Sequence, residues 1–138
     1  MYETVSSVLF VMFSILPCKD ESKLSSFPHG TTLLIYSEDE QEKGHIAYAP
    51  NKSAVEIISM DLGVEDVNSH EAFLVADALI RSVGSIALNA SIITLCTKLQ
   101  GFEKIFADMG FFANGEYLTL YLNKLFSGMC KGCSGDCH

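Results

Sequence analysis

The sequence has few basic side chains for its length. Its 138 residues include nine Lys and Arg against 17 Asp and Glu, which gives a formal net charge of −8. Proteins that bind nucleic acid need a basic face to neutralise phosphates. We therefore expect no nucleic-acid partner. An acidic chain is compatible with a cationic partner or substrate, although many soluble cytosolic proteins are equally acidic.

Long hydrophobic runs are missing as well. A segment that spans a bilayer needs roughly 18 to 20 apolar residues, and no part of the sequence provides them. The N-terminal run VLFVMFSILP is shorter, and the residues before it include Glu3 but no Lys or Arg. A signal peptide begins with a positive region, so the run favours a buried strand over a targeting segment. We expect a cytoplasmic protein with no membrane partner.

The sequence does contain enough apolar material for one core. Hydrophobic residues make up 49% and charged residues 19%, as in a globular domain. Apolar and β-branched runs predict strands, the first of them buried on both faces, with a short helix after it and a charged turn between the second and third. These segments are Val5–Leu16, a helical turn within 18–27, Thr31–Tyr36, the turn Ser37–Gly44, His45–Ala49 and Ala54–Leu62.

The last of these runs breaks strict alternation. Polar and apolar residues alternate from Val55, but the pattern slips by one residue at Ile57-Ile58. An extra residue in a β-bulge would produce this slip, because it reverses the facing of every residue that follows. A strand buried on both faces would produce it too. The pattern supports both interpretations equally.

The second half of the sequence alternates between helices and strands. A helix is predicted over His70–Leu88, with Asn68 or Ser69 as its cap and Glu71 in its first turn. Gly110 marks the end of a second helix. The predicted core stripe of the first helix is Phe73, Ala76, Leu79, Ile80, Val83 and Ile86, and the later elements are a strand Ser91–Thr97, a helix Lys98–Met109, a turn 113–115 and a last strand Glu116–Leu125.

This order of elements is an α+β pattern, and its detail resembles the GNAT (Gcn5-related N-acetyltransferase) superfamily. Three segments carry the resemblance: TTLLIY…HIAYA…AVEIISMDLGVED, ADALIRSV and FEKIFADMGFFANGEYLTLYL. Met109-Gly110-Phe111 matches the Gly-Phe pair that introduces the closing strands of that family. Over about residues 31 to 125, the resemblance implies a GNAT-like mixed, mostly antiparallel sheet flanked by helices.

The resemblance also implies a site for acetyl-CoA or another acyl-CoA, and an amine, small molecule or peptide, as acceptor. Leu62 and Val64 match the Leu-x-Val that ends the fourth strand of the family, and Ala76 matches the last position of its pyrophosphate motif. Glu71 and Leu74 depart from that motif, which has Arg or Gln and a glycine there. An anionic side chain would repel the pyrophosphate, and Leu74 would obstruct it.

Two positions of the resemblance concern proton transfer. Phe106 stands four residues before Gly110, where the family has a proton-donating Tyr, and a phenyl ring cannot donate a proton. Glu56 stands on the fourth strand, where some members keep a carboxylate, and is the candidate catalytic base. The alternative is a solvated strand residue without a role.

The C-terminus differs in composition from the rest of the chain. We expect a GNAT-like domain over residues 1–126 and a Cys-rich tail over 127–138. The tail places four metal-ligating side chains within nine residues, with spacing that suits Zn²⁺ best and an Fe–S cluster or Cu(I) less well. The predicted ligands are Cys130, Cys133, Cys137 and His138. The alternative is a flexible tail with adventitious affinity for metal.

Two functions follow from these observations. The first is an acyl-CoA-dependent N-acyltransferase. The second is a GNAT-like domain that has lost catalysis and serves as a binding or dimerising module, with a metal-binding tail. The departures at Glu71 and Leu74 favour the second, whereas the family resemblance favours the first.

Overall fold

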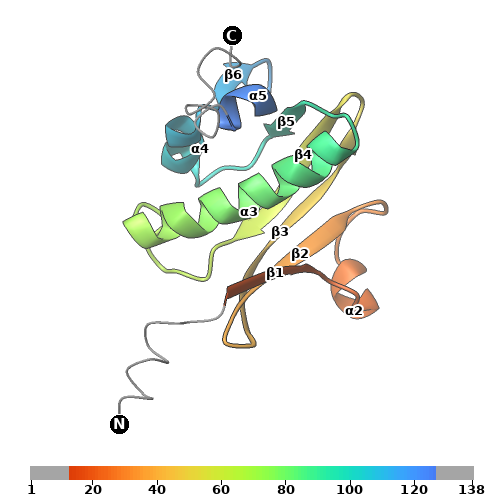
Figure 1. The fold of residues 1–138 in the computed structure, drawn as a ribbon, viewed down its shortest axis with the longest axis vertical. Helices are drawn as coiled ribbons and strands as arrows, with labels where there is room; N and C mark the ends of the chain where they lie inside the picture. The colour runs from red at the N-terminus through yellow and green to blue at the C-terminus, as the bar shows by residue number, and fades with distance from the viewer. Residues whose placement is uncertain (1–12, 127–138) are drawn as a thin grey trace.

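The computed structural model describes residues 13–126, which form one sheet with four helices (Figure 1). Helix α3 is the longest element and runs across the sheet, with α4 on one side of it and β1 on the other (Figure 1). The elements are β1 Phe13–Pro17, α2 Glu21–Leu24, β2 Thr32–Glu38, β3 Gln41–Asn51, β4 Ala54–Asp61, α3 His70–Asn89, β5 Thr94–Thr97, α4 Glu103–Met109, β6 Phe112–Asn114, β7 Tyr117–Tyr121 and α5 Leu122–Leu125.

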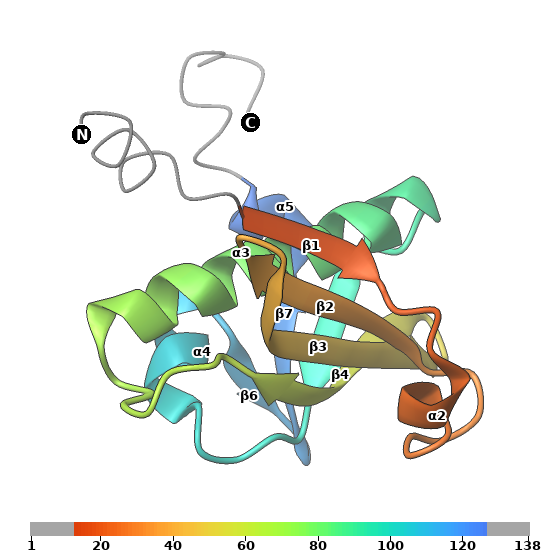
Figure 2. The same ribbon diagram turned by 90° about the horizontal axis from the view of Figure 1, so that it is seen from below.

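The seven strands lie in the order β1-β2-β3-β4-β5-β7-β6, and Figure 2 shows β1 to β4 side by side. Neighbouring strands are antiparallel except β4 and β5, which are parallel because α3 connects them as a crossover. The predicted class, an α+β protein with a mixed and mostly antiparallel sheet, is therefore confirmed.

The first strand differs from its prediction. Residues 5–12 lie outside the described part of the chain, and β1 pairs only with β2. It is an exposed edge strand, in which Phe13 is 63% and Leu16 is 61% exposed. The expectation that this run is buried on both faces is wrong for residues 13–16, because a strand at the sheet edge lacks the side chains of a second neighbouring strand that would cover it.

Strands β2 and β3 extend into the segment that was predicted as a charged turn. The turn itself is short, because Asp39 and Glu40 both have positive φ values of 51° and 70°. Two central residues of this kind make a hairpin turn that matches the twist of the strands. The charged residues on either side of it are therefore strand residues, and β3 begins at Gln41.

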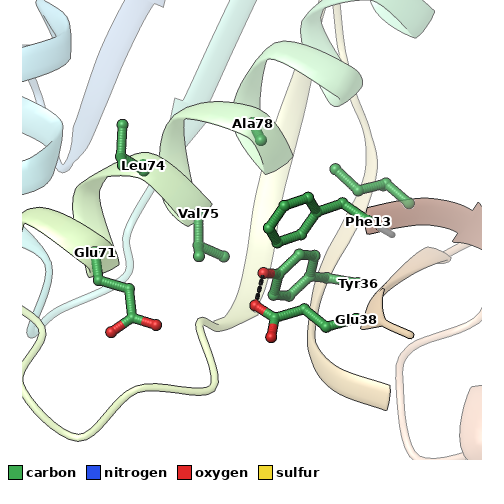
Figure 3. Close-up of a pocket in the computed structure, with 8 residues that line it drawn as sticks. Phe13, Tyr36, Glu38, Glu71, Leu74, Val75 and Ala78 are labelled. Atoms are coloured by element: carbon green, nitrogen blue, oxygen red, sulfur yellow. Dashed lines mark hydrogen bonds between the residues drawn. The ribbon is translucent and has the colours of Figure 1, made fainter. Parts of the chain in front are cut away.

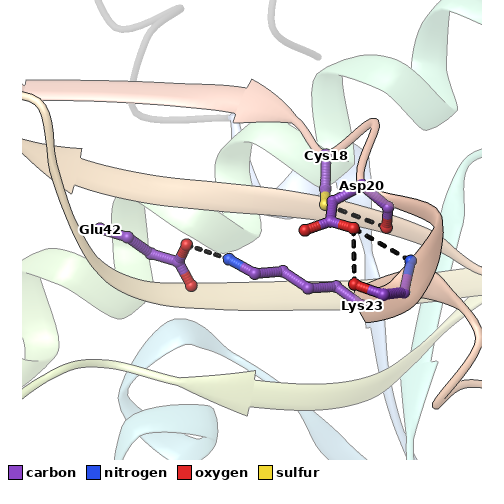
Figure 4. Close-up of polar contacts among 5 residues, drawn as sticks. Cys18, Asp20, Lys23 and Glu42 are labelled. Carbon is purple, nitrogen blue, oxygen red and sulfur yellow. Dashed lines mark hydrogen bonds and ion pairs between the residues drawn. The ribbon is translucent and has the colours of Figure 1, made fainter.

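A short helix lies between β1 and β2. The helical turn predicted within 18–27 is confirmed as α2, and the Asp20 carboxylate accepts the Ser22 N–H at its start. The Ser22 hydroxyl donates to the same carboxylate at 2.7 Å and lowers the pKa of Asp20, and the Ser22 N–H lowers it further. Lys23 forms an exposed ion pair with Glu42, which links α2 to β3 (Figure 4).

Strand β4 contains the bulge that the broken alternation suggested. Tyr48 pairs with Ile57 and Ala47 pairs with Ser59, so that Ile58 is an extra residue without a partner on β3. As a result Ile57 and Met60 both face the core, although they are three positions apart. Of the two interpretations of the Ile57-Ile58 slip, the β-bulge is confirmed.

Two glycines allow the chain to leave β4 in close contact with β3. A Cβ atom at Gly44 would lie 2.1 Å from the Asp61 carbonyl oxygen, and one at Gly63 would lie 2.4 Å from the Lys43 carbonyl oxygen. Gly63 also has a positive φ of 73°. Larger residues would push the β4–α3 connection away from the sheet.

Helix α3 supplies the largest share of the core. It begins at His70, where the Ser69 hydroxyl accepts the Ala72 N–H at 3.1 Å, so Ser69 is the cap. The predicted stripe is wrong at Ile86, which is 41% exposed. The buried residues of α3 are Ala72, Val75, Ala76, Leu79, Ile80, Val83, Gly84 and Ala87.

The C-terminal elements are shorter than predicted. Helix α4 starts at Glu103, five residues later than expected, and β5 starts at Thr94. The predicted last strand ends at Tyr121, and α5 follows it where strand was expected. A Cβ atom at Gly84 would lie 3.0 Å from a Leu122 methyl group, so this mid-helix glycine allows α5 to pack closely on α3.

Candidate functional site

Strands β4 and β5 part after three residue pairs, and this opening is the first feature of the candidate site. The last pair is Ile57 with Thr97, whereas β4 continues to Asp61. The Thr97 hydroxyl is fully buried and donates to the Ile57 carbonyl oxygen at 2.9 Å. It also accepts the Leu99 N–H at 3.1 Å. These two bonds satisfy the backbone where the ladder stops, so the strands separate without leaving buried polar groups unpaired.

Glu56 lies beside this opening, on the face of the sheet opposite α3. Its neighbours Val55 and Ile57 point into the core, so the Glu56 side chain points to the other face. The carboxylate accepts a hydrogen bond from Asn51 Nδ2 at 3.1 Å. The same amide nitrogen donates to the Tyr117 hydroxyl at 3.1 Å. Asn51 on β3 therefore holds the half-buried carboxylate in place, and Tyr117 on β7 holds Asn51.

The surroundings of Glu56 include a thiol. Cys96 stands next to Glu56 in the β4–β5 register and is 7% exposed. Burial raises the pKa of the Cys96 thiol, and the negative charge of Glu56 raises it further. Cys96 is therefore a protonated thiol at neutral pH and a poor nucleophile, as expected for an inert core cysteine.

A second polar pair lies on the same face. His45 Nε2 and the Ser59 hydroxyl are 2.9 Å apart, on β3 and β4, and the Phe27 ring contacts the His45 ring edge-on. The isolated His45 gave no signal in the sequence. Its pairing with Ser59 depends on the bulge at Ile58, because the bulge puts Ser59 on the face that also carries Glu56.

A groove of about 570 Å³ lies between the start of α3 and helix α4. The N–H groups of His70 and Glu71 have no acceptor within residues 13–126, whereas those of Ala72 and Phe73 are satisfied by Ser69. Unpaired N–H groups at the positive end of a helix attract anions. The groove is lined by Asn68, Ser69, His70, Phe73, Lys104 and Asp108.

Helix α4 supplies the one cation of this lining. Lys104 is exposed, and its ammonium group lies 3.1 Å from the Asp108 carboxylate. The pair is a surface i,i+4 contact and therefore weak, so Lys104 can turn to an anion in the groove at little cost. A helix N-terminus and a Lys make this groove suitable for phosphate groups.

The two residues that depart from the pyrophosphate motif lie elsewhere. Glu71 and Leu74 line a different pocket, on the flank of α3 that faces β1 and β2. His70 and Phe73 line the groove instead, because residues 71 and 74 are turned by about 100° around the helix axis from residues 70 and 73. Leu74 therefore does not obstruct the groove, and Glu71 directs its carboxylate away from it.

The other predicted site residues are distributed as follows. Ala76 is fully buried in the second turn of α3. Leu62 is 3% exposed, and Leu62 and Val64 line a pocket of about 100 Å³ at the exit of β4. Phe106 is fully buried, with its ring 4.9 Å from that of Phe111. The roles assigned to Glu56, Leu62, Val64 and Ala76 stay predictions.

Several solved structures share this arrangement of strands and helices. A GNAT family acetyltransferase from Elizabethkingia anophelis, solved with acetyl-CoA bound, is 12% identical, with a TM-score of 0.59 over 80% of this chain and 98% of that one. The IAA acetyltransferase from Bacillus cereus is 10% identical, with a TM-score of 0.57 over 82% and 100%. Tetrahymena GCN5 is 14% identical, with a TM-score of 0.56 over 80% and 96%. The chain has the GNAT fold.

At these identities the likeness concerns the fold and not the reaction. No protein family model matches the sequence, and the comparison with curated proteins gave no match either. The predicted zinc ligands Cys130, Cys133, Cys137 and His138 lie outside the described residues. Within residues 13–126, no helix has the length and apolar character to cross a bilayer. The cytoplasmic location stays a prediction.

Proposed function

We propose that the chain is an N-acyltransferase that moves the acyl group of acetyl-CoA or another acyl-CoA to an amine of a small molecule or peptide. The observation that carries the proposal is the parting of β4 from β5 beside a half-buried carboxylate, in a GNAT fold. The opening, the bulge at Ile58 and Glu56 lie within four consecutive residues of β4.

The groove between α3 and α4 supports the donor side of this proposal. The residues present fit phosphate groups, with the unpaired His70 N–H group on one wall and Lys104 on the other. Bound there, the acyl-CoA would supply a thioester, whose carbonyl carbon is electrophilic. Residues 59–61 of β4 pair with β3 alone, so their other edge is available to receive it.

Glu56 is the base of the proposed mechanism. Its carboxylate would accept a proton from the attacking ammonium group or amine, while Asn51 holds it in position. The amine nitrogen forms the new C–N bond and the C–S bond breaks. A thiolate with an ordinary pKa of about 8.5 leaves without a general acid, which is consistent with the buried phenyl ring at Phe106.

Calorimetric titration with acetyl-CoA tests the proposal. We expect heat of binding, a rise in melting temperature at millimolar ligand, and release of CoA thiol when a panel of amines is added. The matched control is coenzyme A without its acyl group, which should bind but release nothing. Absence of both heat and a thermal shift at millimolar acetyl-CoA would rule out the acyltransferase.

The second function, a non-catalytic binding or dimerising domain, is favoured by a specific feature of α3. Residues 70–83 contain no glycine, so the backbone at the helix start lacks the close-approach positions of the GNAT pyrophosphate motif. This function predicts no acyl-CoA binding and a dimer in sedimentation analysis. Its metal-binding tail is tested by zinc analysis of the purified chain with and without residues 129–138, where equal zinc content would exclude the four predicted ligands.

A further inference from the structure

A pocket of about 410 Å³ lies on the flank of α3 that faces away from α4 (Figure 3). It is formed between α3 and the first two strands, and the Phe13 and Tyr36 rings stack in it with centroids 6.1 Å apart. A cavity of this size holds a small molecule. Its apolar wall consists of Phe13, Ile15, Tyr36, Leu74, Val75 and Ala78.

Both charged residues of this pocket are acidic. Glu38 on β2 and Glu71 on α3 line it from opposite sides, and their carboxylates lie at the same end of the pocket in Figure 3. The Tyr36 hydroxyl donates to Glu38 Oε2 at 2.5 Å and holds it there. Glu71 forms no ion pair within residues 13–126. The pocket thus combines an apolar body with a negative end.

We propose that this pocket binds an amphipathic primary amine, with the ammonium group at the Glu38 and Glu71 carboxylates and the apolar part against the rings. Charge complementarity selects a cation, because two carboxylates repel an anionic ligand and bind a neutral donor less strongly than an ammonium group. The aromatic faces add a cation–π contribution for an ammonium group near the rings.

The proposed ligand is not the acceptor of the acyl transfer. Tyr36 faces the α3 side of the sheet, whereas Glu56 faces the other side, so the sheet separates the two positions. The inference therefore goes beyond the proposed function and does not depend on it. An amine in this pocket would instead link α3 to β1 and β2, two strands that α3 otherwise contacts through few side chains.

One cation lies near the negative end. Lys43 lines the adjoining pocket of about 100 Å³, which shares Tyr36, Glu38 and Glu71 with the larger one. The Lys43 side chain is exposed and makes no ion pair within the described range 13–126. Because Lys43 is solvated, it does not neutralise the two carboxylates. Its positive charge still repels the ammonium group of a bound amine. Lys43→Met is therefore expected to raise the affinity for an amine.

Titration of the full chain, followed by two-dimensional ¹H–¹⁵N NMR, tests the proposal. The probe is 4-phenylbutylamine, and the matched ligands are 4-phenylbutanol and 4-phenylbutyrate, which change the charge but keep the ring and chain. We expect the amine to shift the amide signals of residues 71–78 and to bind about tenfold more tightly than the alcohol. The acid should not bind.

Variants then locate the ligand. Glu71→Gln and Glu38→Gln are each expected to lower the affinity for the amine about fivefold. Glu65→Gln is the matched control, because Glu65 is exposed in the β4–α3 loop and lines none of the pockets described above. Ala78→Phe fills the pocket from an exposed helix position and should abolish binding without unfolding the chain.

Three results would overturn the proposal. The first is equal affinity for the amine and the alcohol, since the carboxylates would then play no part. The second is an equal effect of Glu65→Gln and Glu71→Gln, because general surface charge would then explain the binding. The third is the absence of any shift at residues 71–78 with millimolar amine. Acetyl-CoA binding is measured separately on the same samples, so failure of one proposal does not count against the other.

Discussion

The two flanks of helix α3 can be compared directly, because they share one backbone and differ only in which residues they carry. The flank toward α4 presents His70, Phe73 and unpaired N–H groups to a groove that also contains Lys104. The flank toward β1 presents Glu71 and Leu74 to an apolar pocket that also contains Glu38. A shift of one position along the helix therefore changes a site suited to anions into one suited to cations.

This comparison shows why the pyrophosphate motif is a poor guide for this chain. Comparison with the motif placed Glu71 and Leu74 where a phosphate would lie. The capped start at Ser69 sets α3 so that these two residues turn to the other flank. The residues that would meet a phosphate are His70 and Phe73, together with Lys104 from α4.

The largest expected effect comes from truncating a buried side chain of α3, because the buried face holds the helix and both of its flanks in place. Leu79 is fully buried, and Leu79→Ala should lower the free energy of unfolding by about 2 to 5 kcal/mol through loss of burial and the cavity it leaves. Leu74 is 53% exposed, and Leu74→Ala should change it by less than about 0.5 kcal/mol. Urea unfolding measures both. Equal losses would mean that the flank toward β1 is part of the core.

The next effect tests whether the chemical step can be separated from ligand binding on the two flanks. Glu56→Gln should lower the release of CoA thiol about 100-fold, because the amide cannot accept the proton, while the Asn51 nitrogen keeps an oxygen acceptor. Affinities for acetyl-CoA and for 4-phenylbutylamine should not change. Glu116→Gln, an exposed carboxylate on the turn before β7, is the control. Unchanged turnover in Glu56→Gln would remove Glu56 from the mechanism.

A smaller effect separates the two flanks from each other. Lys104→Met should weaken acetyl-CoA binding about fivefold and leave amine binding unchanged, since one charge contact to a phosphate is lost. Glu71→Gln should weaken amine binding and leave acetyl-CoA binding unchanged. Calorimetry of both variants with both ligands gives the four dissociation constants. A variant that weakens both ligands alike would show that the flanks are coupled through α3.

The smallest effect concerns the tyrosine of the acidic pocket. Burial, helped by the hydrogen bond to Glu38, raises the pKa of Tyr36. The folded state then keeps a proton that the unfolded chain loses at its ordinary pKa of about 10, so stability is present below that pH and lost above it. Between about pH 8 and about pH 10 the loss is about 0.4 kcal/mol.

Tyr36→Phe removes this contribution, while Tyr48, whose pKa burial also raises, remains in both proteins. The difference in free energy of unfolding between wild type and variant should therefore narrow as the pH rises. A pH-independent difference would show that Tyr36 ionises in the folded state as readily as in the unfolded chain.

Much of the fold could be predicted where side chains repeat with a clear period. Helix α3 was placed to within one residue at each end, because its apolar positions recur at helical spacing and Ser69 caps it. The bulge at Ile58 was one of two interpretations of a break in period. The pattern could not predict how many strands pair with a given strand. The apolar run at β1 was therefore predicted to be buried, although β1 lies at the sheet edge.

The end of the last strand shows a second limit. The alternation of EYLTLYLNKL is typical of a strand throughout, but β7 ends at Tyr121 because its partner β5 begins at Thr94. After a last hydrogen bond from the Leu122 N–H to the Ile93 carbonyl oxygen, the chain turns into α5, and Leu122 packs against Gly84. Pairing length is set by the partner strand and cannot be derived from the alternation of one segment.

The candidate site was predictable one residue at a time but not as a group. Glu56 was identified from its place on β4. Asn51 holds Glu56, and Tyr117 holds Asn51, but neither gave a signal. Tyr117 is 66 positions from Asn51, and their contact exists only once β3, β4, β5 and β7 are assembled. The acidic pocket was missed for the same reason, since Glu38 and Glu71 meet across two elements.

The single extra residue at Ile58 changes whether the odd-numbered or the even-numbered residues of strand β4 face α3. Before it, the odd-numbered residues Val55 and Ile57 face the helix, and after it the even-numbered Met60 and Leu62 do. Deleting this residue would shorten the strand by one step, yet it would exchange inside for outside at every later position. An alignment of related chains that places a gap a few residues from Ile58 would assign the side chains between the gap and Ile58 to the wrong face.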